Sequence, residues 1–467
     1  MNRLKNFIID NKFNLLLVIL YFSITTFTMF HHEIWRDEAQ VWCIVRDLNL
    51  LESIKGASYE GHPFLWYLIL YPFAKAGLPV ISMQIISLAA VFASVLLFIF
   101  KSPFNGFFKT FFVFSAGMVY YLPVIARNYS LVPIFLFLIA AFYPKRNERP
   151  FLYSVLIILL SQTHILIFGV CAILFISFSI ESFQIFLKEK NYKKLISPII
   201  IGLNFLIMFG LFFTSIKENS AVAHYFEEES ITFYETIQEI IHVEFPFITI
   251  ILFDNFLILA SLFIFIFSAF KLYQKNKIAA CVFVAGISFI FLVLNNFWFG
   301  GILNQKTFLI SLISVFCLWT GGLAKDKIIN LIFCFLFFIS AVCSYDVISK
   351  EVRYNFSGGK EIANYIKNNL DNEETFIVVA LPFTVSSISA YLPDKKLYFY
   401  QYKTYISFYK FKNNGKEKIN PPSNVKYLIV QDDYFEFNKG LYKEIFRTKN
   451  ENLSGDTQKE IYAIYTK

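Results

Sequence analysis

An acidic pair, Asp37 and Glu38, lies between Trp35 and Trp42, directly after the first long apolar segment of the chain. A carboxylate close to a membrane surface is partly desolvated, and it can accept a proton from a hydroxyl or an ammonium group. The same residues are also compatible with an ordinary solvated loop in which the two tryptophans anchor the chain at the interface. The spacing leaves both interpretations open.

Two isolated cationic residues are found in other short polar segments of the chain. Arg127 is the only charge in the short segment 126–130, and Lys306 is the only charge in the segment 296–307, which also contains Gly300 and Gly301. An arginine fork matches two phosphate oxygens at once. Alternatively, both cations are flanking residues that reach toward lipid headgroups.

The segment 217–246 is strongly acidic, with seven glutamates against Lys217. A solvated face is the simplest interpretation. One glutamate could contact an acceptor or a divalent metal, but adjacent glutamates alone do not define a metal site. No cofactor follows with certainty.

The amino-acid composition indicates which class of protein carries these residues. Of 467 residues, 57% are hydrophobic and 16% are charged, and the mean hydropathy is +0.55. Soluble domains have about 45–50% apolar and about 25% charged residues, so a disordered chain, a coiled coil and a lone soluble enzyme are excluded. The net charge of +8 does not indicate nucleic acid, because many basic residues lie in short loops between apolar segments. Six cysteines without a C-x-x-C pair argue against a disulfide scaffold or a zinc finger.

A transmembrane helix needs about 20 mainly apolar residues. Eleven segments have approximately this length and composition. This count divides the apolar run 151–186 at the polar residues 161–164. It also takes the N-terminal segment as a retained transmembrane span rather than a cleaved signal peptide. They are 13–30, 80–100, 110–125, 130–143, 151–163, 165–186, 195–216, 247–270, 278–297, 307–323 and 328–345.

The segment 63–78 is ambiguous, because it is short and contains Pro72 and Lys75. If it does not cross and the N-terminus is cytoplasmic, the inner loops carry 17 basic residues and the outer loops carry seven. Cytoplasmic loops are enriched in Lys and Arg. We therefore expect a juxtamembrane or re-entrant segment, a first outer loop over 31–79 and an extracytoplasmic tail. The protein is predicted to be a multi-pass protein of a bacterial inner or plasma membrane.

The predicted spans contain only two acidic residues, Glu181 and Asp254, and no Lys or Arg. Ionisable residues within the bilayer usually mark transport pathways. Their scarcity disfavours an ion-coupled transporter and suggests chemistry at one membrane face.

Residues 346–467 form a separate, well-solvated segment after the transmembrane region 1–345. A helix is predicted at 361–369, and strands at 375–380, 397–400, 427–430 and 460–465. We expect a small α/β domain. Asp432 and Asp433 follow the third strand and could form a site, but a turn is the favoured interpretation.

Three motifs resemble the GT-C superfamily of membrane glycosyltransferases, which includes the protein O-mannosyltransferases and the lipid A aminoarabinose transferase. They are the Asp37-Glu38 pair, the stretch 61–67 beginning Gly-His-Pro, and the turn 127–131 beginning Arg-Asn-Tyr. A weaker fourth match is the start of the tail at 357–363. The resemblance implies a mostly α polytopic membrane protein of about 11 transmembrane helices with a small C-terminal α/β soluble domain.

The resemblance also implies a reaction. Asp37 would be the catalytic base and Glu38 its partner, Arg127 and Lys306 would bind the donor phosphate, and His62 and Tyr129 would bind substrate. The donor would be a sugar on a polyprenyl phosphate, and a glycan, lipid or protein would accept it by an inverting transfer at the outer face. Many relatives have an Arg-His pair where this chain has Gln305-Lys306. A transporter or flippase and a polymerase or ligase of lipid-linked glycans are the alternatives.

Overall fold

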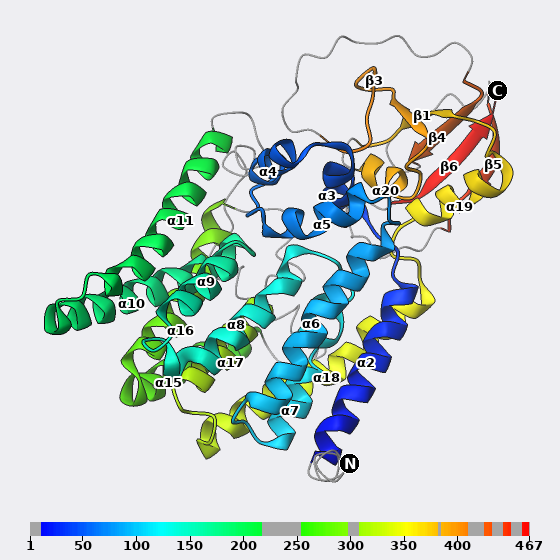
Figure 1. The fold of residues 1–467 in the computed structure, drawn as a ribbon. Coiled ribbons are helices and arrows are strands. Elements are labelled where there is room, and N and C mark those ends of the chain that lie inside the picture. The colour runs from blue at the N-terminus through cyan, green and yellow to red at the C-terminus, as the bar shows by residue number, and fades with distance from the viewer. Residues whose placement is uncertain are drawn as a thin grey trace, which may run out of the picture. The chain divides into compact units, whose positions relative to one another are not determined.

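The computed structural model describes residues 11–216, 254–297, 308–381, 384–409, 425–431, 442–449 and 460–466 (Figure 1). The chain divides into two compact units, which are described separately. Unit 1 comprises Met1–Phe27, Ser58–Trp66 and Ser87–Val347. Unit 2 comprises Thr28–Ala57, Tyr67–Ile86 and Ile348–Lys467. The C-terminal segment therefore shares a unit with much of the predicted first outer loop.

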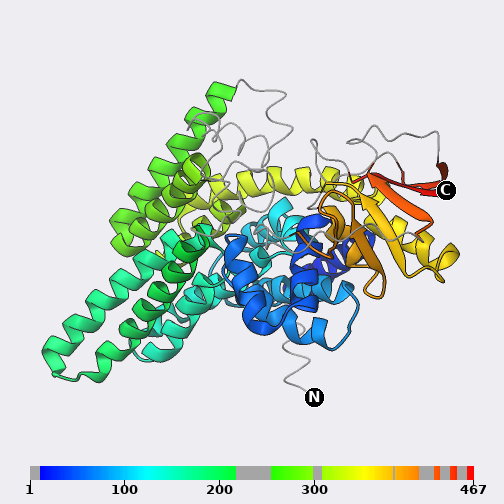
Figure 2. The same ribbon diagram turned by 90° about the horizontal axis from the view of Figure 1, so that it is seen from above.

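Apolar helices account for most of the first 353 residues, because segments this poor in charge satisfy their backbone in lipid only as helices. They are α2 (Lys12–His31), α6 (Ile81–Lys101), α7 (Gly106–Val113), α8 (Val132–Phe142), α9 (Pro150–Ser161), α10 (Phe168–Glu189), α11 (Lys193–Ile216), α15 (Asp254–Lys275), α16 (Lys277–Phe297), α17 (Phe308–Thr320) and α18 (Lys327–Arg353). Within unit 1, α10 packs against both α11 and α16, and α15 packs against α16 (Figures 1 and 2).

Six helical segments of the described residues are long and apolar enough to cross a membrane. They are Lys12–His31, Ile81–Lys101, Asn128–Lys145, Ile165–Glu189, Lys193–Thr214 and Lys327–Arg353. Three shorter apolar helices are Pro150–Ser161, Lys277–Val293 and Phe308–Thr320. Each of these nine segments coincides with a predicted span. The predicted span 247–270 begins outside the described residues, and the total of 11 spans stays a prediction.

The predicted division of the run 151–186 is confirmed. Helix α9 ends at Ser161, and α10 begins at Phe168 after a short 3-10 helix, Ile165–Ile167. The Nδ1 atom of His164 accepts a hydrogen bond of 3.1 Å from the backbone N–H of Leu166, which caps that short helix.

The predicted span 110–125 is not one continuous α-helix. Helix α7 ends at Val113, and a π-helical turn follows at Gly117–Tyr121. A Cβ atom on Gly117 would lie 2.6 Å from the ring of Phe308, so only glycine permits this close approach.

The predicted first outer loop, most of which belongs to unit 2, is helical. It contains α3 (Arg36–Asp47), α4 (Leu50–Tyr59, which ends in unit 1) and α5 (Leu65–Lys75, which begins in unit 1). Helix α5 corresponds to the ambiguous segment 63–78. Its 11 residues extend about 16 Å, roughly half the thickness of a hydrocarbon core. Its length is consistent with a segment that does not cross.

The C-terminal segment forms the expected α/β structure. Its six strands have the order β3-β2-β1-β4-β6-β5. They are β1 (Thr375–Val379), β2 (Lys396–Phe399), β3 (Thr404–Tyr405), β4 (Tyr427–Gln431), β5 (Lys443–Arg447) and β6 (Tyr462–Thr466), with helices α19 (Gly359–Asn369) and α20 (Val385–Ser389). β1 is parallel to β2 and β4, and the other pairs are antiparallel. The apolar face of α19, with Ile362 and Ile366, packs on Phe376 and Val378 of β1.

The predicted helix and the four predicted strands are confirmed to within two residues. β3, β5 and α20 were not predicted. The turn at Asp432 and Asp433 lies outside the described residues.

Candidate functional site

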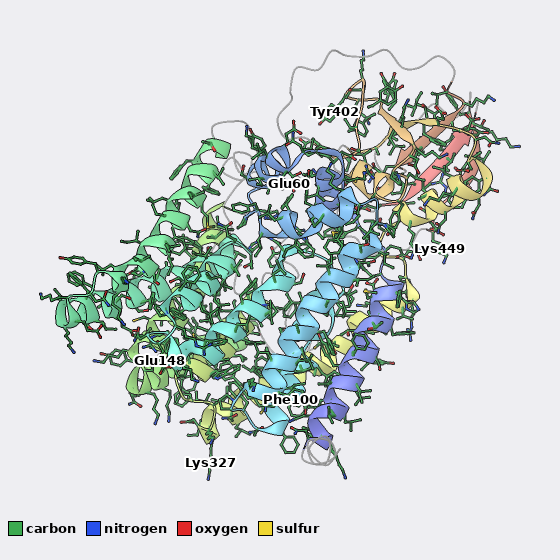
Figure 3. The ribbon with its side chains drawn as sticks, in the orientation of Figure 1. Glu60, Phe100, Glu148, Lys327, Tyr402 and Lys449 are labelled. Atoms are coloured by element: carbon green, nitrogen blue, oxygen red, sulfur yellow. The ribbon has the colours of Figure 1, made fainter. Side chains whose placement is uncertain are left out.

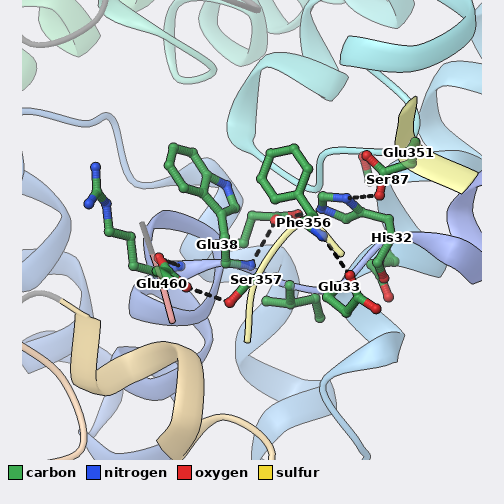
Figure 4. Close-up of polar contacts among 12 residues, drawn as sticks. His32, Glu33, Glu38, Ser87, Glu351, Phe356, Ser357 and Glu460 are labelled. Atoms are coloured by element: carbon green, nitrogen blue, oxygen red, sulfur yellow. Dashed lines mark hydrogen bonds and ion pairs between the residues drawn. The ribbon is translucent and has the colours of Figure 1, made fainter. Parts of the chain in front are cut away.

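A buried cluster in unit 2 joins two ionisable side chains from the start of the predicted first outer loop to one from α18 (Figure 4). His32 Nε2 is 2.9 Å from Glu38 Oε2, and His32 Nδ1 is 3.1 Å from Glu351 Oε1. All three side chains are 0% exposed. Since an ionised carboxylate only accepts hydrogen bonds, both ring nitrogens donate and His32 is an imidazolium. We call these residues the charged cluster.

The electrostatics agree with this protonation state. Burial alone disfavours a charged imidazole, but the negative charges of Glu38 and Glu351, together with their hydrogen bonds, outweigh it and raise the pKa of His32 from 6.5 to about 10. The imidazolium therefore persists at neutral pH.

Glu38 also organises the start of α3. Its Oε2 atom accepts a hydrogen bond of 3.3 Å from the backbone N–H of Trp35, the residue before the helix. This contact is one half of a capping box, in which the third helical residue reaches back to the cap. Glu38 therefore has contacts that fix the backbone next to Asp37.

Asp37 is in a different environment from its neighbour. Its side chain is 38% exposed, and its Oδ1 atom lies 3.6 Å from Nε of Arg36, which is 19% exposed. It stands in the first turn of α3, where the helix dipole favours a negative charge. Of the predicted pair, only Asp37 combines a carboxylate with access from outside the protein.

Residues from the C-terminal segment hold the beginning of α3. Glu460 Oε1 accepts a hydrogen bond of 3.2 Å from Arg36 N–H, and Ser386 Oγ donates to the Arg36 carbonyl at 3.0 Å. The hydroxyl of Tyr391 accepts a hydrogen bond of 2.8 Å from Ile34 N–H. These partners are separated from α3 by more than 340 residues in sequence.

The half-buried carboxylate of Glu33 and a second contact of the buried Glu460 complete this anchoring. Glu33 Oε2 accepts a hydrogen bond of 2.7 Å from Phe356 N–H, and Glu460 accepts one from the hydroxyl of Ser357 (Figure 4). Burial raises the pKa of Glu33 and of Glu460 above the ordinary value of a glutamate. The C-terminal segment thus supplies much of the scaffold that positions Asp37.

A second cluster lies in unit 1 and brings three predicted site residues together. Arg127 Nη2 donates to His62 Nε2 at 3.4 Å, and the Arg127 guanidinium lies 6.0 Å from the centre of the Tyr129 ring. His164, which was not predicted as a site residue, stacks on Tyr129 with 4.1 Å between ring centres and lies 5.7 Å from the ring of His62. We call these four residues the Arg127 cluster.

The turn that carries Arg127 is rigidly packed. Asn128, which is 3% exposed, donates from Nδ2 to the Thr163 carbonyl at 2.8 Å. Ser87 donates to Ser130 at 2.8 Å. Arg127 is half-buried between buried neighbours, so its guanidinium is the cation that this turn presents. The polar interruption 161–164 in an apolar run was the sequence signal that could have identified His164.

The remaining predictions lie partly outside the described residues. Lys306, Gln305 and the acidic loop 217–246 fall there. Within the residues that the structure describes, no group of three His, Cys, Asp or Glu side chains is arranged to hold a metal ion. A role for a divalent metal stays a prediction.

Comparison with known proteins identifies the fold. No protein-family model and no curated protein matches the chain. Among solved structures, it is similar to ArnT from Cupriavidus metallidurans bound to undecaprenyl phosphate, with a TM-score of 0.55 and 10% sequence identity. The alignment covers 97% of this chain and 98% of that chain.

At this low identity the similarity establishes the fold. It confirms the expected GT-C-like architecture over nearly the full length, and together with the long apolar helices it identifies an integral membrane protein.

Proposed function

We propose that this protein is an inverting glycosyltransferase that moves a sugar from a polyprenyl-phosphate donor to a hydroxyl or amine of an acceptor. The reaction would take place at the extracytoplasmic face of a bacterial inner or plasma membrane. The acceptor would be a glycan, a lipid or a protein of the cell envelope.

The observation that carries this proposal is the full-length similarity to ArnT, a protein whose structure holds undecaprenyl phosphate. The contrast between Asp37 and Glu38 supports it. A base must reach the acceptor, and the Asp37 carboxylate is accessible at a helix start, whereas Glu38 is enclosed by His32 and the Trp35 backbone.

The proposed step conserves atoms and charge. The acceptor oxygen or nitrogen attacks the anomeric carbon of the donor sugar, and Asp37 takes the proton from that atom. The bond between the anomeric carbon and the phosphate oxygen breaks, and polyprenyl phosphate leaves with the bonding electrons. A single direct displacement inverts the configuration at the anomeric carbon.

The other predicted residues take supporting roles. Arg127 and Lys306 would stabilise the negative charge that develops on the leaving phosphate. His62 and Tyr129, which contact Arg127, would bind the donor. Glu38 would act through the backbone of α3 as a positioning residue for Asp37.

Asp37→Asn tests the central assignment. The amide keeps the size of the side chain but cannot take the proton, so we expect transfer to fall by at least about a hundredfold, the lower range for loss of a general base. Glu52→Gln on α4 is the matched control, since that exposed residue lies in the same loop region. Transfer can be followed in membranes by the loss of sugar from the polyprenyl-phosphate lipid, with protein amount and thermal stability measured in parallel.

Undiminished transfer by a folded Asp37→Asn protein would remove Asp37 from this role. Mass spectrometry of the lipid that co-purifies with the protein separates the alternatives. A polyprenyl monophosphate with one sugar supports the proposal, whereas a pyrophosphate-linked oligosaccharide favours a flippase or a polymerase. Cysteine labelling that places positions 37 and 127 on opposite sides of the membrane would also refute it.

A further inference from the structure

A crevice of about 610 Å³ opens in unit 1 between the first turns of α7 and α18. The two helices lie beside each other, as shown by ring-centre distances of 5.5 Å for Phe108 and Phe337 and 5.3 Å for Phe111 and Phe338. Lys327, at the first position of α18, is one of the residues that line it, and its side chain is labelled in Figure 3. Ligand pockets commonly have volumes of about 300–1,000 Å³, so the crevice can hold part of a lipid.

One end of the crevice is positively charged. Lys325 and Lys327 both line it and are exposed. The acidic residue between them, Asp326, is already engaged, since it accepts hydrogen bonds from the N–H groups of Ile328 and Ile329 and lies 3.4 Å from Lys271 Nζ. The two lysines therefore give this end a local excess of positive charge.

Asn330 adds a polar group to the same end. It is only 7% exposed, and its Nδ2 atom donates to the carbonyls of Ala324 and Asp326, each at 2.8 Å. Its Oδ1 atom is buried and accepts no hydrogen bond from the part of the chain that the structure describes. Because a buried acceptor without a donor is costly, this atom favours a ligand that brings a hydroxyl or an N–H group.

The rest of the crevice is mainly apolar, and its one further polar side chain, Asn105, accepts a hydrogen bond of 2.9 Å from the backbone N–H of Phe108. Lys327, Leu331 and Cys334 follow one another along one face of α18, so the wall changes from charged to apolar with distance from the helix start. Phe107 and Phe111 form a similar stripe on α7. Phe107 is 75% exposed and Leu331 is 73% exposed, which suits side chains that contact lipid.

We propose that this crevice binds an anionic phospholipid whose headgroup carries a hydroxyl, such as phosphatidylglycerol. Lys325 and Lys327 pair with the phosphate, the headgroup hydroxyl donates to Asn330 Oδ1, and an acyl chain lies along Leu331, Cys334 and Phe107. The predicted topology places both lysines on the cytoplasmic side, where anionic lipids attract basic residues. This inference does not depend on the proposed sugar transfer.

Native mass spectrometry of the full-length protein in an uncharged detergent tests the proposal. The protein is given equal amounts of phosphatidylglycerol and phosphatidylcholine with identical acyl chains. We expect preferential retention of phosphatidylglycerol. The variant Lys325→Ala/Lys327→Ala should lose at least about tenfold of that preference, because each basic residue near an anionic lipid contributes roughly a factor of five.

Two further variants make the result specific. Lys275→Ala/Lys277→Ala removes two exposed lysines from another loop and should retain the preference. Cys334→Trp fills the apolar part while keeping both lysines, and it should reduce binding of both lipids. Excess inorganic phosphate should leave retention unchanged, and displacement by it would assign the site to a free anion instead.

The proposal is overturned if the wild-type protein shows no preference between the two lipids. Equal loss in the Lys275/Lys277 control, or an unchanged preference in Lys325→Ala/Lys327→Ala, would also overturn it. Each of these outcomes is independent of whether Asp37→Asn retains sugar transfer.

Discussion

The charged cluster of unit 2 and the Arg127 cluster of unit 1 are stabilised in different ways. In the charged cluster, one imidazolium pairs with two carboxylates, and none of the three side chains has exposed surface. In the Arg127 cluster, the Tyr129 ring stacks on His164, and a hydrogen bond from Asn128 to the Thr163 carbonyl fixes the turn next to the half-buried cation. His164 belongs to the second type, since its Nδ1 atom accepts a backbone N–H and therefore carries no proton.

This difference suggests that the charged cluster is part of the structural scaffold and that the Arg127 cluster is the candidate binding surface. Buried charges must be compensated within the protein, because removing one partner leaves the other charge without solvent or counter-charge. The charged cluster therefore stabilises the fold around Asp37. In the Arg127 cluster, stacked rings and hydrogen bonds of uncharged groups fix the turn that presents the cation.

His32→Gln should have the largest effect of the variants that test this comparison. A neutral amide cannot compensate two buried carboxylates, so we expect a loss of about 3–5 kcal/mol in the free energy of unfolding. Unfolding of the purified protein in detergent, followed by intrinsic fluorescence against denaturant, gives the measurement. His31→Gln is the matched control, since the adjacent histidine is only half-buried and its replacement should cost much less.

A double variant sharpens the interpretation. His32→Gln combined with Glu351→Gln removes one of the two uncompensated charges and should recover part of the loss. The contrary result would be a double variant that is less stable than His32→Gln, by as much as the loss of another buried contact costs. Uncompensated charge would then not explain the stability loss of His32→Gln.

The pH dependence of stability should also differ between the clusters. The folded pKa of His32, about 10, exceeds its unfolded value of 6.5, so its contribution is complete below about pH 6.5, declines as the pH rises and is lost above about pH 10. The imidazolium faces Glu38 and Glu351, with Glu33 nearby. The wild-type protein should therefore lose more thermal stability between pH 7 and pH 10 than His32→Gln does. Parallel curves for the two proteins would contradict the assignment of charge to His32.

The sequence predicted those features that depend on local patterns. Apolar runs located the helices, the polar residues 161–164 located the break between α9 and α10, and short β-branched and aromatic runs located β1 and β4. It also placed Asp37 and Glu38 shortly after the first apolar helix, where the structure has the first turn of α3.

The contacts that define the two clusters could not be predicted in this way. His32 and Glu351 are 319 residues apart, and Arg36 and Glu460 are 424 residues apart. No periodicity in the sequence relates such positions. β5 was missed for a different reason: its residues are exposed or half-buried and include charged side chains, so no buried face creates an alternating apolar pattern.

Asn128→Ala should have the smallest effect on stability. It tests whether an uncharged hydrogen bond fixes the turn of the Arg127 cluster. The variant removes the hydrogen bond from Nδ2 to the Thr163 carbonyl and leaves that buried acceptor without its donor, a loss of about 1–2 kcal/mol. Asn369→Ala is the matched control, because that exposed side chain makes the same type of bond to the Tyr365 carbonyl at 3.0 Å, and water can replace it. Because no charge is involved, the stability loss of Asn128→Ala should be the same at pH 7 and at pH 10. A loss as large as that of His32→Gln, or one that changes with pH, would show that ionised groups also hold the turn that presents Arg127.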